Sequence, residues 1–121
     1  MNDSILQDIR KLLGGSTTDN TYFDQDIILH ANTFLANLVQ MGIGTKGFLL
    51  TNATQTWAEF LGDSYPAAYL PQVKSYVYMR VKLIFDPPAS SIAVDALEKA
   101  CKELAWRLNV EVDPGMDDLN T

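Results

Sequence analysis

Apolar side chains recur every three to four residues in four stretches of the chain, which places them on one face of a helix. Glycine and proline separate these stretches: Gly14-Gly15, Gly42 and Asp86-Pro87-Pro88 each stop a helical pattern. The pattern predicts an all-α domain of about four helices, of which the last two form a hairpin. The expected helices cover residues 4–13, 22–41, 70–85 and 90–108.

Capping signals support these helix starts and predict one further turn. In a capping box, the hydroxyl residue at the N-cap of a helix is followed three residues later by a residue with an acidic or amide side chain. Ser90 or Ser91 is expected to cap the last helix. The pair Thr56 with Glu59 predicts a helical turn or two over residues 56–61. The pairs are Ser4 with Gln7, Thr21 with Asp24 and Thr56 with Glu59.

Two segments lack helical periodicity. Residues 42–53 are punctuated by glycine and predict a long loop, with or without a short strand. From Asn109 onward the sequence is acidic, contains Pro114-Gly115 and has no basic residue. We therefore divide the chain into a helical domain, 1–108, and a flexible acidic tail, 109–121. Segments 43–55 and 109–121 are expected to be disordered alone and to fold on contact with a partner.

Composition agrees with one globular domain. The chain has 121 residues, of which 47% are hydrophobic and 20% charged, so it can form a core. The net charge of −6 argues against nucleic-acid binding as the main task. A single cysteine excludes an internal disulfide. Because no apolar run approaches a membrane span and the start lacks signal-peptide features, we expect a soluble protein.

The sequence contains few groups that could support catalysis. It has no phosphate-binding glycine loop, no His-Glu-x-x-His and no Cys-x-x-Cys. His30, the only histidine, lies at the edge of an apolar stripe, and Cys101 lies on a core-facing stripe. We therefore expect a protein that is not an enzyme, with no catalytic residue, no metal and no cofactor.

Two residues break the helical pattern. Trp106 lies on the polar side of the last helix, about 180° from Leu97. It is either a contact residue or is covered by another part of the chain. Arg80 lies beside the apolar face of the third long helix, where it either meets a carboxylate or backbone carbonyls, or extends its charged end past the apolar edge. We favour the second interpretation for Arg80.

The order of these elements resembles the head–tail connector (adaptor) proteins of tailed double-stranded DNA phages, over residues 3–109. The most specific part is the turn at Phe85-Asp86-Pro87-Pro88, which leads into Leu97-Glu98-Lys99 and Glu103-Leu104-Ala105-Trp106-Arg107-Leu108. Earlier segments that carry the resemblance are Tyr22-Phe23-Asp24-x-Asp26-Ile27-Ile28, Gly42-x-Gly44 with Gly47-Phe48, Thr56-Trp57-x-x-Phe60-Leu61 and Val73-Lys74-Ser75-Tyr76-Val77-Tyr78.

The resemblance implies a structural virion protein of the phage neck, made in the host cytoplasm. Such a subunit is expected to form a ring, commonly of twelve copies, below the portal protein. The ring would extend the DNA channel and provide a platform for the head-closure (stopper) or tail protein. Genomic double-stranded DNA would pass through the lumen without sequence-specific binding, and no membrane or catalytic residue is implied.

Three groups of residues are candidates for these contacts. The expected subunit-interface residues are Trp106, Ile92, Lys99 and Lys102 on the last helix, with Tyr78, Met79 and Lys82 on the third. The expected portal-docking residues of the tail are Asn109, Val110, Glu111, Val112, Asp113 and Pro114. The expected partner-loop residues are Gly44, Lys46, Phe48 and Leu49.

An alternative function uses the basic residues of the third helix. Lys74, Arg80 and Lys82 lie among tyrosines, a combination that can bind nucleic acid. The alternative is a small helical DNA-binding or regulatory module, whose affinity would fall steeply with salt.

Overall fold

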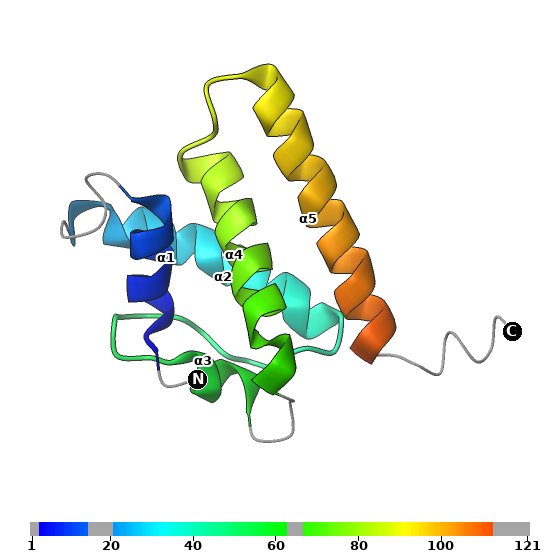
Figure 1. The fold of residues 1–121 in the computed structure, drawn as a ribbon. Coiled ribbons are helices and arrows are strands. Elements are labelled where there is room, and N and C mark those ends of the chain that lie inside the picture. The colour runs from blue at the N-terminus through cyan, green and yellow to red at the C-terminus, as the bar shows by residue number, and fades with distance from the viewer. Residues whose placement is uncertain (1–2, 15–20, 63–66, 113–121) are drawn as a thin grey trace, which may run out of the picture.

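The computed structural model describes residues 3–14, 21–62 and 67–112, and these form a helical domain (Figure 1). The predicted all-α class is confirmed. No strand occurs in these three segments; the nearest feature is an isolated antiparallel bridge between Ser4 and Thr56. The elements are α1 (Ile5–Leu13), η2 (Thr21–Phe23), α2 (Asp24–Gln40), α3 (Trp57–Leu61), η3 (Ala67–Tyr69), α4 (Leu70–Phe85) and α5 (Ser91–Val112).

Helix α4 lies at the centre of the domain. It packs against α1 and α2 on one side and against α5 on the other. Figure 1 shows α4 crossing α2, with α5 running antiparallel beside it after the turn at residues 86–90. This position explains why α4 is apolar over most of its circumference, and it confirms the predicted hairpin of the last two helices.

The core lies where these helices meet. Val73, Val77 and Val81 of α4 are fully buried, and Trp57 and Phe60 of α3 close the core below them. The remaining fully or almost fully buried residues from α1, α2, α5 and the loop are Ile5, Leu6, Ile9, Ile27, Ala31, Leu35, Leu38, Ile43, Leu50, Cys101 and Leu108.

Three predicted caps are present and one is wrong. The Ser4 and Thr56 hydroxyls accept hydrogen bonds from backbone N–H groups three residues on, each at 3.2 Å, and Ser90 accepts one from Ala93 at 3.3 Å. The Thr21–Asp24 cap is not formed. The 3-10 turn η2 precedes α2, so Phe23 occupies the cap position without a side-chain hydrogen bond.

Aromatic packing accounts for that correction. The Phe23 ring meets the Phe85 ring edge-on, with centroids 5.5 Å apart. Tyr22 packs on Phe23 in the same way at 5.0 Å. The contact joins the start of α2 to the end of α4, so Phe23 lies where a hydroxyl cap was expected and α2 begins at Asp24 rather than at Tyr22.

The expectation that residues 43–55 are disordered alone is wrong. Two carboxamide side chains bind this loop to the domain. The Asn32 carboxamide donates to the Leu50 carbonyl at 2.9 Å and accepts from the Leu50 N–H at 2.8 Å. The Gln55 carboxamide accepts from the Thr51 N–H at 2.6 Å and donates to the Leu49 carbonyl at 2.7 Å. With Ile43 and Leu50 buried, the loop is ordered without a partner.

Helix α5 is longer than predicted. It continues to Val112, whereas the periodicity indicated an end near Leu108. The positions 109–112 are therefore helical, and the rest of the expected tail lies outside the described residues. None of the helices described has the length and apolar character needed to cross a membrane.

A polar network connects α1, α3 and α4. One oxygen of the Asp8 carboxylate accepts from the Trp57 indole N–H at 2.9 Å and lies 2.9 Å from the Lys74 ammonium. Lys74 also lies 3.3 Å from Asp3. Burial alone would lower the pKa of Lys74, but the hydrogen bonds to and negative charges of Asp8 and Asp3 outweigh it, so this pKa is raised.

We predict that the network makes stability fall at alkaline pH. Folding raises the pKa of Lys74. The contribution of its ion pairs to the free energy of unfolding is therefore complete below the ordinary lysine pKa, and it is lost as the pH rises through the pKa of the folded state. Urea unfolding of wild type and Asp8→Asn measured across this range should give curves that converge at high pH. A constant difference between the two would contradict the assignment. Asp8→Ala should cost about 1–3 kcal/mol more than Asp8→Asn at neutral pH, because it also leaves the buried indole N–H unpaired.

We predict that Gly44→Ala strongly destabilises the domain. Gly44 has φ +93°, and a Cβ there would overlap the Phe60 ring. Gly47 is the matched control, since it has φ +84° and nothing within 4 Å of an added Cβ. Gly47→Ala should cost roughly 1–2 kcal/mol of unfolding free energy from backbone strain alone. Gly44→Ala should cost about 1–3 kcal/mol more, because Phe60 is fully buried. Equal losses in urea unfolding would show that Phe60 moves aside.

Candidate functional site

The predicted interface residues of α5 share one exposed face. One side of α5 packs on α4 through Cys101, Leu104 and Leu108. On the opposite side Ile92 is 80% exposed and Trp106 is 66% exposed, and Lys99 and Lys102 are exposed between them. We call Ile92, Lys99, Lys102 and Trp106 the outer face of α5. No part of the described chain buries Trp106, so its exposed ring is available for contact in this conformation.

The candidates on α4 lie elsewhere. Tyr78 and Met79 are partly buried, and Tyr78 packs against the core. Lys82 is paired with Asp86: its ammonium lies 3.6 Å from the carboxylate and donates a hydrogen bond to the backbone carbonyl at 3.2 Å. A fourth residue of α4, Ile84, is 51% exposed although it is apolar.

The tail and loop candidates divide between surface and interior. Asn109 is exposed on α5, and Val110, Glu111 and Val112 continue that helix. Asp113 and Pro114 lie outside the described residues. In the loop, Lys46 and Leu49 are exposed, whereas Gly44 and Phe48 face the Phe60 ring. Only Lys46 and Leu49 of the four loop candidates are therefore available to a partner in this conformation.

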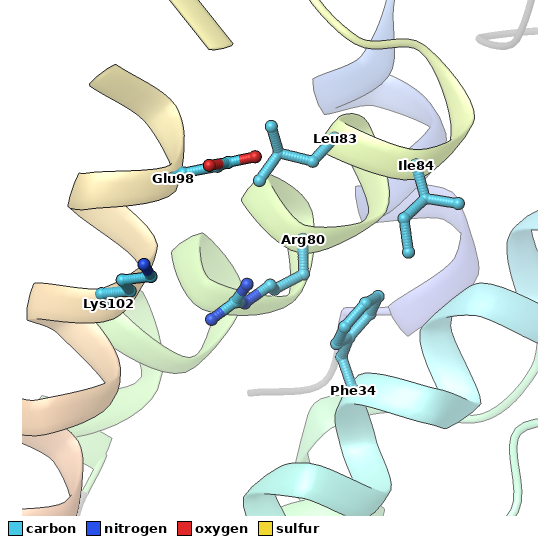
Figure 2. Close-up of a pocket in the computed structure, with 6 residues that line it drawn as sticks. All are labelled: Phe34, Arg80, Leu83, Ile84, Glu98 and Lys102. Atoms are coloured by element: carbon cyan, nitrogen blue, oxygen red, sulfur yellow. The ribbon is translucent and has the colours of Figure 1, made fainter. Parts of the chain in front are cut away.

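Three helices form a groove that the periodicity did not predict. We call it the α2–α5 groove; α4 forms its floor. It consists of two adjoining hollows of about 250 and 460 Å³, both lined by Arg80. Figure 2 shows the first, lined by Phe34, Arg80, Leu83, Ile84, Glu98 and Lys102. The second is lined by Asn37, Gln40, Met41, Tyr76, Arg80, Ala105, Trp106 and Asn109.

Arg80 is the central charged group of this groove. Its guanidinium lies 5.5 Å from the centre of the Tyr76 ring and points toward α5 near Lys102 (Figure 2). No carboxylate of the described residues forms an ion pair with it, and its Nε is buried without a hydrogen-bond partner. The favoured interpretation, that Arg80 extends its charged end past the apolar edge, agrees with this geometry. Its placement beside an apolar helix face was the only sequence signal of the groove.

The other two residues considered for chemistry, Cys101 and His30, lie within helices and are buried or partly buried. Cys101 is fully buried, and this burial raises the pKa of its thiol; the nearby Arg80 charge opposes the shift and Glu98 adds to it. His30 is partly buried on α2. Within the segments described, no group of three or more His, Cys, Asp or Glu residues could hold a metal ion. The features that stand out are surfaces for contact: the outer face of α5 and the α2–α5 groove.

Comparison with known proteins identifies the family. Residues 5–115 match the family model described as phage connector protein. Because the match covers most of the chain, the protein belongs to the phage connector protein family, and the predicted resemblance is confirmed. Membership supports a head–tail connector role and a location in the virion. The chain matches no curated protein and no solved structure.

Proposed function

We propose that this connector protein assembles as a closed ring below the portal, extends the DNA channel and offers a platform to the head-closure or tail protein. Twelve copies would match the portal, and the protein acts without catalysis. The observation that carries the proposal is the outer face of α5. An exposed tryptophan and an exposed isoleucine lie on the same side of α5, about 21 Å apart along the helix with two exposed lysines between them, and large exposed apolar side chains of this kind are typical anchors of protein interfaces.

A ring needs two different surfaces on each subunit, because its contacts are head to tail. The outer face of α5 supplies one. The exposed part of the 42–55 loop supplies a second surface on a different element, and the α2–α5 groove adjoins the outer face, since Lys102 and Trp106 line both. The outer face of α5 and the loop are therefore two different surfaces that could meet the two neighbouring subunits.

The charge distribution supports DNA passing through the ring without being held. The net charge is −6. Of the three basic residues that suggested nucleic-acid binding, Lys74 is paired with Asp8 and Asp3, and Lys82 with Asp86. Arg80 lies in the groove rather than beside them on an open surface. The alternative of a DNA-binding module thus loses the basic patch it requires.

Native mass spectrometry of the protein mixed with the portal ring of the same phage tests the proposal. We expect one copy to add per portal subunit, giving a closed complex of fixed stoichiometry. The portal alone and the connector alone, both shown to be folded by circular dichroism, are the controls. Absence of any complex between the two folded proteins would contradict a ring below the portal.

We predict that Trp106→Ala weakens assembly without weakening the fold. Because Trp106 is 66% exposed, its loss should change the unfolding free energy by less than about 0.5 kcal/mol. As the anchor of an interface it should cost about 2 kcal/mol of binding, close to a thirtyfold loss of affinity. Leu29→Ala on α2, where Leu29 is 64% exposed, is the matched control and should leave assembly unchanged. If Trp106→Ala lowered thermal stability but left assembly intact, Trp106 would stabilise the fold rather than the interface.

A further inference from the structure

We propose that the α2–α5 groove binds the acidic segment 113–121 of the same chain, with the carboxylates of Asp117 and Asp118 facing Arg80 and Lys102. This occupancy belongs to the free subunit and does not rest on the proposed ring. Any contact of the segment with the portal would have to release it from the groove.

The charges of the groove favour an acidic occupant. Its charged lining residues are Arg80, Lys102 and Glu98, so positive charge is in excess. The Arg80 guanidinium forms no ion pair with the residues described, although an arginine that is partly buried usually meets a carboxylate. Two adjacent carboxylates would supply the missing partner and leave the cation–π contact with Tyr76 in place.

The apolar lining matches the residues beside those carboxylates. Met116 and Leu119 flank Asp117-Asp118 in the sequence. Phe34, Leu83 and Ile84 line the first hollow, and Met41 and Trp106 line the second. A segment that presents an apolar, two acidic and another apolar residue in succession thus meets a groove whose lining contains both basic and apolar side chains.

The segment also starts at the right place. Helix α5 ends at Val112, and Asn109, one turn earlier, already lines the second hollow. Pro114-Gly115 is a turn signal that would reverse the chain after the helix. From Gly115 to Asp118 an extended chain spans roughly 10 Å. Two turns of α5 rise by about the same amount, so an extended segment of this length could reach back along α5 as far as Trp106.

Attachment to the same chain favours this occupant over a second copy. A short connection keeps the segment at an effective concentration on the order of millimolar next to its own groove. Free subunits at micromolar concentration do not reach that value. The ionic part of the contact is at the surface, so it should weaken as salt screens it.

Acrylamide quenching of tryptophan fluorescence in the full-length protein tests the proposal. Trp57 is 1% exposed and is quenched little, so Trp106 dominates the signal. In wild type, quenching of Trp106 should rise roughly twofold between low and high salt as the segment leaves the groove. Asp117→Asn with Asp118→Asn should show the high value at all salt concentrations. Asp26→Asn with Asp95→Asn, which removes the same charge from exposed positions that do not line the groove, should behave as wild type.

Charge exchange provides a second measurement on an exposed position. Lys102→Glu should raise quenching at low salt, and Lys102→Glu combined with Asp118→Lys should restore the wild-type value. Equal quenching in wild type and in the Asp117→Asn, Asp118→Asn variant would overturn the proposal. Protection that grows with protein concentration would also overturn it, because the groove would then be filled by another copy. Neither result bears on whether the portal binds.

Discussion

The burial of α4 on two opposite sides is the constraint on which the rest of this structure depends. Its valines close the core with α1 and α2, and its other side carries α5. A helix that gives up both sides to intramolecular packing leaves little surface for partners of its own. Contact with other proteins is consequently left to the elements around it, and α5, which packs through one side only, has the most surface to offer.

The same constraint explains which parts of the fold were predictable from the sequence. Helix positions follow from apolar spacing and local caps, so α1, α3, α4 and the hairpin were recovered closely. The Thr21 cap failed because Phe23 meets Phe85, a contact between residues far apart in the chain. The order of the 42–55 loop was missed for a similar reason: Asn32 binds it across 18 positions, and no local pattern indicates which amide reaches which carbonyl.

The candidate site divides in the same way. The outer face of α5 is a property of one helix, and angular position alone placed Trp106, Lys99 and Ile92 together on it. The groove is a property of three helices, and its lining comes from residues as distant as Phe34 and Lys102. Sequence periodicity gives the face of a helix but not the crossing of two helices. Arg80 signalled an anomaly, and only the packing of α2, α4 and α5 shows what surrounds it.

The loop clamps have a consequence for a particle that meets changing ionic conditions. Asn32 and Gln55 hold residues 49–52 through neutral amide groups, which neither titrate nor respond to screening. The Lys74 pairs depend on charge at the neighbouring end of the bundle. Alkali or salt should therefore weaken the polar contacts between α1 and α4 before it alters the shape of the loop. The contacts between α1 and α4 thus respond to pH and ionic strength, whereas the conformation of the loop does not.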